Sequence, residues 1–216
     1  MESHSNIQGV YLVGGLRFHR DFPSFLDAIE QAFLGGIRLF QLRVKDELSD
    51  RDHLDLARKV RSLTRQYNVT YLLNDRFDIA VLCDADGVHL GPDDLPAAEV
   101  RKIIGDKIIG RSSHSLEQAK IAIQEPISYL SVGPVYGTDC KKVPDTKVGT
   151  DLVSEALKIT MLPIVAIGGV TTENIGPVRK TGVNCVGVIR DIMGAPDLRL
   201  ASKSFIDAFN VCGENN

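Results

Sequence analysis

The chain has 216 residues, of which 44% are hydrophobic, and this is enough to build one substantial core. Its formal net charge of -3 argues against nucleic acid as a main partner, because nucleic-acid-binding surfaces usually carry a basic excess. Apolar runs all fall short of the roughly 20 residues that a membrane-spanning helix needs, so we expect no membrane partner.

The four cysteines are far apart in the sequence and form no CxxC pair. The chain also begins without the charged and apolar regions of a secretory signal, so we expect a cytoplasmic protein with reduced thiols. Residues 1–8 and 213–216 are polar and are interpreted as tails, which leaves residues 9–212 as one domain. The sequence leaves open whether this domain forms a homo-oligomer.

Short β-branched runs alternate with amphipathic segments along the whole chain, which is typical of consecutive βα units. The expected strands are Gly9–Gly15, Leu39–Lys45, Thr70–Asp75, Gly87–Gly91, Lys107–Ser113, Tyr129–Val135, Ile164–Val170 and Cys185–Asp191. The expected helices are Phe22–Leu34, Ser49–Tyr67, Phe77–Cys83, Ala97–Ile104, Leu116–Gln124, Leu152–Ile159, Thr172–Lys180 and Leu198–Phe209.

Eight such units of about 27 residues each predict a single-domain α/β fold, the (β/α)8 TIM barrel, at the short end of its usual size. A doubly wound sheet stays open as the alternative, because alternation does not say whether the sheet closes.

Polar side chains alternate at the end of the second expected strand. Gln41, Arg43 and Lys45 share one face of this strand and would point into the barrel. Buried charges need partners, so one interpretation is an interior filled by salt bridges. The other is an anion clamp, in which Arg43 binds two oxygens and Lys45 supplies a point charge.

Two carboxylates follow the next two strands. Asp75 and Asp94 would lie at the carboxyl ends of buried strands, where parallel α/β folds place their chemistry. Two acids beside two cations suit a diphosphate bridged by Mg²⁺, which binds through one or two carboxylates and phosphate oxygens. Alternatively, Asp75 is the N-cap of the helix that begins at Phe77, and Asp93 or Asp94 opens a turn before Pro96.

The loops after the last two strands predict a phosphate site. Gly168 and Gly169 follow the seventh strand, and barrels commonly bind phosphate here through backbone N–H groups. The irregular stretch 133–149 is rich in glycine, proline and lysine, and we interpret it as a lid over an anion.

The fifth strand ends near a serine and a histidine. Ser112 and His114 resemble a nucleophile and its base, but no orienting acid lies nearby, so an acyl-transfer triad is not expected. We expect Ser112 to donate a hydrogen bond to an anion, whereas His114 is either a helix-start residue or a catalyst. His89 is interpreted as a buried histidine whose hydrogen bonds are satisfied.

Taken together, these motifs resemble the thiamine-phosphate synthase family from Tyr11 to about Asp197. The matching segments are Gln41-Leu-Arg43-x-Lys45, Asn74-Asp75-x-x-Asp78-x-Ala80, Ala85-Asp86-Gly87-Val88-His89-x-Gly91-x-x-Asp94, Gly110-x-Ser112-x-His114, Gly133-Pro134-x-x-x-Thr138-x-x-Lys141, Ile167-Gly168-Gly169 and Gly194-Ala195-Pro196-Asp197. The resemblance implies a barrel that couples 4-amino-5-hydroxymethyl-2-methylpyrimidine diphosphate to 4-methyl-5-(2-phosphoethyl)thiazole and releases diphosphate.

The same resemblance implies a role for individual residues. Asp75 and Asp94 would bind magnesium. The pyrimidine diphosphate would contact Gln41, Arg43, Lys45, Asn74, Ser112 and Lys141. The thiazole phosphate would contact Thr138, Gly169 and the backbone at Ile189 and Arg190.

The chain departs from the family pattern at Pro92, Cys140 and the pair Arg190-Asp191. The segment 138–142 also resembles the related thiazole tautomerase, an isomerase that uses a histidine in the Ser112-x-His114 motif and has no need of the paired acids. The alternatives are therefore this tautomerase, or a barrel without catalytic activity that binds thiamine precursors.

Overall fold

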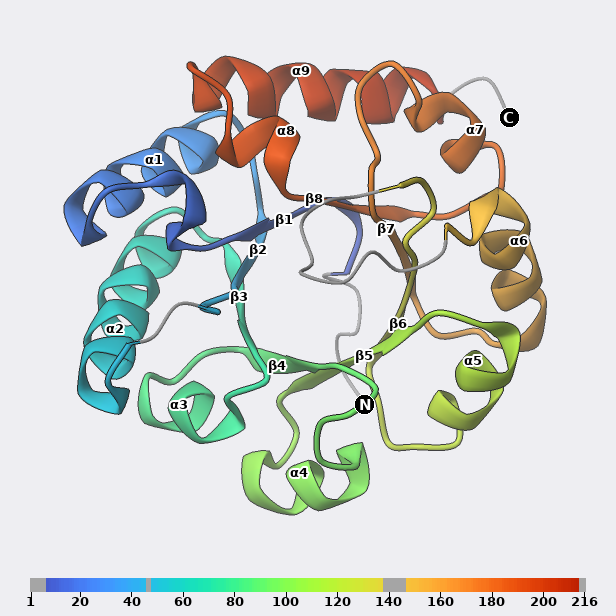
Figure 1. Cartoon of the computed structure of the whole chain (residues 1–216), viewed down its shortest axis with the longest axis horizontal. Helices are drawn as coiled ribbons and strands as arrows, with labels where there is room; N and C mark the ends of the chain where they lie inside the picture. The colour runs from blue at the N-terminus through green and yellow to red at the C-terminus, as the bar shows by residue number, and fades with distance from the viewer. Residues whose placement is uncertain (1–6, 46–47, 138–146, 214–216) are drawn as a thin grey trace.

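The structure is a computed structural model that describes residues 7–45, 48–137 and 147–213. Eight parallel strands form a closed barrel in sequence order, and the helices surround it (Figure 1). The barrel closes where the last strand pairs with the first, which places Cys185 beside Gly9. The predicted (β/α)8 barrel is therefore confirmed, and the open, doubly wound alternative is excluded.

All eight predicted strands are present. They are β1 (Gly9–Gly14), β2 (Leu39–Leu42), β3 (Thr70–Asn74), β4 (Gly87–Leu90), β5 (Ile108–Ser113), β6 (Tyr129–Val132), β7 (Ile164–Ile167) and β8 (Cys185–Val188). The helices are η1 (Leu16–Phe18), α1 (Phe22–Leu34), α2 (Asp50–Gln66), α3 (Phe77–Leu82), α4 (Ala97–Ile104), α5 (Leu116–Ala122), α6 (Gly149–Ile159), α7 (Ile175–Arg179), α8 (Arg190–Met193) and α9 (Leu198–Val211).

Seven of the eight predicted strands are too long at their carboxyl ends, whereas the fifth ends at Ser113 as predicted. β2 ends at Leu42 and β8 at Val188, so Arg43, Lys45 and Arg190 lie in loops or at a helix start rather than on strands. β2 is short because it pairs with β3 over four residue pairs, after which the chain leaves the barrel. The helix α8 was missed because it is very short and directly continues an apolar strand. Helix α6 begins earlier than predicted and α7 later.

Side chains alternate between the barrel interior and the layer beneath the helices. The interior cluster consists of Ile7, Tyr11, Val13, Leu39, Leu72, Tyr129, Val165 and Cys185. The residues between them, such as Leu12 and Phe40, pack under the surrounding helices. Ile7, which we assigned to the N-terminal tail, is 3% exposed and belongs to this interior cluster.

Side-chain caps define where several helices begin. Asp21 caps α1 in a capping box with Ser24, and Ser49 caps α2 by accepting the Asp52 N–H. Asp197 caps α9, which packs against α1 and closes the outer ring.

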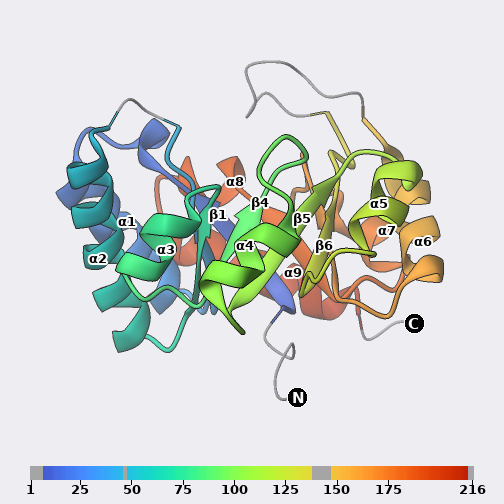
Figure 2. The same ribbon diagram turned by 90° about the horizontal axis from the view of Figure 1, so that it is seen from below.

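The loops that follow the strands gather at one end of the barrel, the upper side in Figure 2. The middle of the predicted lid, residues 138–146, lies outside the described residues. In the described ranges, no helix is both long and apolar enough to cross a membrane.

Candidate active site

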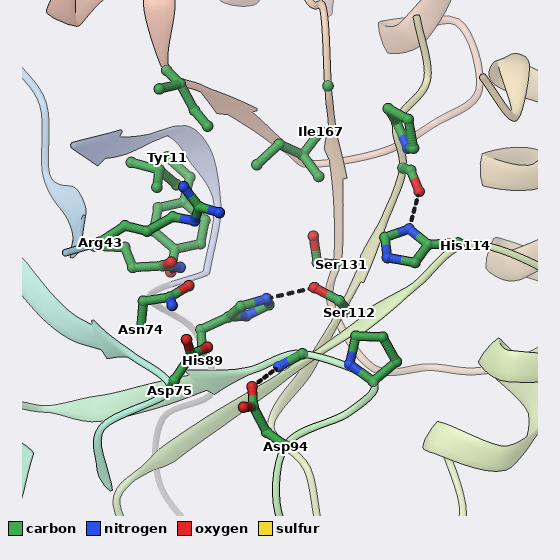
Figure 3. A pocket seen from close by; sticks show the side chains of 18 of the residues that line it. Tyr11, Arg43, Asn74, Asp75, His89, Asp94, Ser112, His114, Ser131 and Ile167 are labelled. Carbon is green, nitrogen blue, oxygen red and sulfur yellow. Dashed lines mark hydrogen bonds between the residues drawn. The ribbon is translucent and has the colours of Figure 1, made fainter. Parts of the chain in front are cut away.

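A cavity of about 320 Å³ opens at the carboxyl ends of the strands (Figure 3). This size falls in the range of small-molecule sites, and the position is where barrel enzymes place their chemistry. The cavity brings together most of the predicted site residues, namely Gln41, Arg43, Lys45, Asn74, Asp75, Asp94, Ser112 and Ile189. Two others, Thr138 and Lys141, lie outside the described residues.

Asp75 and Asp94 lie on the same side of the cavity although they come from different loops (Figure 3). Asp75 follows β3 in a left-handed conformation, with a φ of 61°. The Asp94 carboxylate accepts the Gly91 N–H at 2.6 Å. Burial, followed by the nearby Asp75 carboxyl, raises the pKa of Asp94. The two carboxylates therefore repel each other when both are charged, and a cation between them would relieve this repulsion.

The alternative interpretations of the two acids have different outcomes. Asp75 is not the N-cap of α3: that position belongs to Arg76, and no side chain caps the helix. Asp94 does not open a turn before Pro96 but ends one, because its own N–H donates to the Gly91 carbonyl at 3.3 Å. Although this turn contains Pro92, a departure from the family pattern, the Asp94 side chain still lines the cavity.

The two cations of the second unit line the mouth of the cavity. Lys45 Nζ lies 2.5 Å from Asp75 Oδ2, and the Lys45 side chain is 54% exposed. The backbone N–H of Arg43 donates to the Gly14 carbonyl at 2.7 Å, which anchors the start of the loop after β2 to β1. A salt-bridged barrel interior is therefore wrong for Lys45, since its charge lies at the mouth of the cavity. Gln41, by contrast, is buried inside.

A chain of hydrogen bonds runs from this buried glutamine across the barrel. Gln41 Nε2 donates to the Tyr11 hydroxyl at 2.6 Å, and the hydroxyls of Tyr11 and Tyr129 are 3.0 Å apart. The Tyr129 hydroxyl lies 2.8 Å from His89 Nδ1, and His89 Nε2 lies 2.8 Å from Ser112 Oγ. The interpretation of His89 as buried and satisfied is confirmed. We missed both tyrosines, although each is a polar residue at an inward position of an apolar strand.

Arg111 is another functional candidate that the sequence analysis missed. Its side chain is 10% exposed and donates to the carbonyl oxygens of Leu95, at 3.1 Å, and Pro92, at 3.4 Å. Glu125 lies 3.9 Å from the same guanidinium, and its other oxygen accepts the first N–H of α4. These contacts hold the loop that carries Asp94 from both sides. No local sequence pattern indicates this role, because Arg111 and its partners come from three separate segments of the chain.

The predicted phosphate loops form a small cavity of about 30 Å³ that shares Ile167, Gly168 and Ile189 with the larger one. Gly169 and Arg190 line it. Gly169 has a φ of 67°, and a Cβ here would lie 2.5 Å from the Gly137 carbonyl oxygen. A side chain is therefore excluded on both conformational and steric grounds. Arg190 is half exposed and lies 3.9 Å from Asp191, a distance at which pairing is weak.

His114 and Asn74 also line the wall of the larger cavity. His114 directly precedes Ser115, the N-cap of α5, as the helix-start interpretation predicted, and its ring also lines the cavity. His114 Nδ1 lies 2.5 Å from the Gly133 carbonyl, so this nitrogen carries the hydrogen. Asn74 Nδ2 is buried and has no hydrogen-bond partner among the described residues. Such a donor costs free energy unless a ligand accepts its hydrogen bond.

The sequence profile of the family described as thiamine monophosphate synthase matches residues 10–192. A thiamine-phosphate synthase of Pelotomaculum thermopropionicum is 41% identical over 177 residues, covering 82% of this chain and 81% of the relative. A thiamine-phosphate synthase of Bacillus licheniformis is 39% identical over 207 residues, which cover 94% of this chain and 92% of the relative.

A solved structure, the thiamine phosphate pyrophosphorylase from Pyrococcus furiosus, superimposes with a TM-score of 0.87 and 32% sequence identity. The match covers 96% of this chain and 98% of that one. A 3-hexulose-6-phosphate synthase structure matches with a TM-score of 0.66 but only 14% identity, which shows a shared fold and nothing further.

Proposed function

The chain belongs to the thiamine monophosphate synthase family, and we propose that it joins 4-amino-5-hydroxymethyl-2-methylpyrimidine diphosphate to 4-methyl-5-(2-phosphoethyl)thiazole, forming thiamine phosphate and diphosphate. It is a transferase of thiamine biosynthesis that acts on small molecules. One observation carries the choice of substrates: the acids Asp75 and Asp94 share a cavity with the cations Arg43 and Lys45.

The reaction breaks the bond between the pyrimidinylmethyl carbon and a diphosphate oxygen, and the electron pair leaves with diphosphate. The thiazole nitrogen then supplies the electron pair of the new carbon–nitrogen bond. No protein nucleophile is required, so the protein must hold the reactants in line, neutralise the growing charge on diphosphate and keep water out.

Members of this family use a metal ion in catalysis, and we propose Mg²⁺ held by Asp75 and Asp94. The two carboxylates fit this ion, because Mg²⁺ prefers hard oxygen ligands and binds proteins through one or two carboxylates. No larger cluster, of three or more His, Cys, Asp or Glu, occurs within the described residues. Water and phosphate oxygens would complete the shell. When bound, the ion would supply positive charge to the departing diphosphate.

Charge on the diphosphate would also be met by the protein itself. Arg43 would bind two oxygens through its planar guanidinium, and Lys45 would move from Asp75 to the ligand. Ser112 would donate a hydrogen bond. Lys141 is assigned the same task from the family resemblance alone, since it lies outside the described residues.

The remaining contacts distinguish the two substrates. Gln41 and Asn74 would contact the pyrimidine diphosphate, which supplies the acceptor that the buried Asn74 Nδ2 lacks. Gly169 and the backbone at Ile189 and Arg190 would hold the thiazole phosphate in the smaller cavity. Thr138, outside the described residues, would add to this second site.

A cytoplasmic location is also part of the proposal. Cys83, Cys185 and Cys212 are free thiols, which suits a reducing compartment. Whether the enzyme acts as a homo-oligomer is answered by its mass in solution.

The decisive experiment incubates the purified protein with both precursors, with and without Mg²⁺, and follows thiamine phosphate and diphosphate. We expect both products in equal amounts and a strict dependence on the metal. Metal-independent proton exchange on a thiazole phosphate carboxylate, without coupling, would instead identify the tautomerase. Ligand-induced thermal stabilisation without any turnover would identify a binding protein.

A further inference from the structure

We propose that the buried chain from Gln41 to Ser112 has one fixed proton polarity, which makes the Ser112 hydroxyl a hydrogen-bond donor toward the cavity. Tyr11, Tyr129 and His89 act in it as positioning residues, because they set the hydroxyl's direction through one another. The chain is buried over most of its length: Tyr11 is 2%, Gln41 3%, Tyr129 0% and His89 8% exposed.

The polarity follows from the glutamine end. Gln41 Nε2 can only donate, so the Tyr11 oxygen accepts at that contact. The Tyr11 hydrogen then needs an acceptor, and the Tyr129 oxygen at 3.0 Å is the other partner of this hydroxyl in the described structure. Buried hydroxyls rarely leave a hydrogen unpaired, so Tyr11 donates to Tyr129.

The same reasoning continues to the cavity. The Tyr129 oxygen accepts from Tyr11, so its own hydrogen goes to His89 Nδ1 at 2.8 Å. His89 Nδ1 is then an acceptor, and the neutral ring carries its hydrogen on Nε2. His89 Nε2 donates to Ser112 Oγ at 2.8 Å, which leaves the Ser112 hydrogen available for a ligand.

The opposite polarity would suit a different ligand. With every hydrogen reversed, His89 Nε2 would accept from Ser112, and the serine would present only lone pairs to the cavity. Lone pairs repel a phosphate oxygen, whereas an O–H group binds one. The chain therefore selects an anionic group at Ser112. This last step rests on the proposed function, in which that anion is diphosphate.

The polarity itself can be measured without substrate. Nitrogen-15 NMR of histidine-labelled, ligand-free protein reports which ring nitrogen carries hydrogen, and the His89 signals are those lost in His89→Gln. We expect hydrogen on Nε2 and none on Nδ1. A ring with hydrogen on Nδ1, or on both nitrogens at neutral pH, would overturn the proposal. Because no turnover is involved, this result stands whether or not the protein couples the two precursors.

The consequence for binding is tested with inorganic diphosphate and Mg²⁺ in a calorimetric double-mutant cycle of Tyr129→Phe and Ser112→Ala. Removing the tyrosine hydroxyl frees His89 to accept from Ser112, so we expect binding to weaken about five- to tenfold. With Ser112→Ala already present, Tyr129→Phe should have no further effect. An equal loss in both backgrounds would contradict the coupling.

Two more variants make the cycle conclusive. Tyr71→Phe is the matched control, because it removes a fully buried hydroxyl that bonds to Ala57 outside the barrel interior. It should leave diphosphate binding unchanged. Tyr11→Phe removes the donor that fixes Tyr129 as an acceptor but leaves the Tyr129 hydroxyl on His89, so if Tyr129→Phe does not fold, Tyr11→Phe takes its place in the cycle with a smaller expected loss of binding.

Discussion

Lys45 Nζ lies 2.5 Å from Asp75 Oδ2, so one of the paired acids holds the cation that lies at the mouth of the cavity. With 54% of the lysine side chain exposed, this ion pair contributes little to stability. A phosphate group can therefore replace the carboxylate as the partner of Lys45 at small cost. The ion pair thus keeps a positive charge beside the acids until substrate arrives.

Removing either cation should affect turnover more than binding of the second substrate. We expect Arg43→Gln and Lys45→Gln each to lower kcat by about 10²-fold with an unchanged KM for the thiazole phosphate, because the charge they oppose grows as diphosphate departs. Steady-state kinetics with each substrate varied would measure this. Lys59→Gln removes a lysine from a surface pair with Asp55 and should leave kinetics unchanged. Wild-type kcat in both active-site variants would remove these residues from the mechanism.

Asp94→Asn and His114→Ala distinguish coupling from isomerisation. The amide cannot supply the negative charge that holds the metal, so we expect Asp94→Asn to raise the Mg²⁺ concentration for half-maximal rate by about tenfold or more. His114→Ala should be milder, because coupling needs no histidine base. Rates measured across a magnesium titration give both numbers. Loss of all activity in His114→Ala, with Asp94→Asn fully active at low magnesium, would reverse the assignment.

Arg111 should control metal affinity without touching the metal. Arg111→Met removes the donors that hold the Pro92 and Leu95 carbonyls, so the Asp94 loop should loosen and Mn²⁺, used as a paramagnetic substitute, should bind about tenfold more weakly. Electron paramagnetic resonance measures this affinity without turnover.

The matched control for this variant is Arg61→Met. Arg61 forms a bidentate salt bridge with Asp86, and its side chain is 14% exposed, but neither residue lines the cavity. Both variants should lose about 3 kcal/mol of stability, since each leaves a carboxylate without its partner. Only Arg111→Met should lose metal affinity, and equal affinities in the two variants would reduce Arg111 to a stability role.

Gly169→Ala should impair the phosphate site specifically. The residue has a φ of 67°, and an added Cβ would lie 2.5 Å from the Gly137 carbonyl, so the loop after β7 must shift. We expect KM for the thiazole phosphate to rise about tenfold, with diphosphate binding retained. Gly182→Ala is the control: its φ is 91°, and nothing lies within 4 Å of the added Cβ. Both variants should show strain of about 1–2 kcal/mol in unfolding experiments, and only the first a changed KM.

Much of the site was predictable because parallel barrels place the carboxyl ends of their strands at one edge. Asp75 and Asp94 follow two such strands, Ser112 lies near the end of a third, and all three residues line the cavity. The prediction that Lys45 points into the barrel was wrong, because we extended the strand alternation past Leu42, where β2 ends. A strand ends where its pairing with the neighbouring strand ends, and the sequence of one strand does not show how far its neighbour extends.

The sequence by itself determined the βα alternation, the strand centres and the identity of the charged residues at the strand ends, because these depend on local periodicity and on neighbours along the chain. The tertiary structure decided that β8 closes on β1, that Arg111 holds the Asp94 loop, and that Tyr11 meets Tyr129 across a separation of 118 positions. Such contacts depend on the register and curvature of the closed barrel. A buried polar group must find its partner wherever that geometry brings one within about 3 Å, and distance along the chain does not constrain the choice.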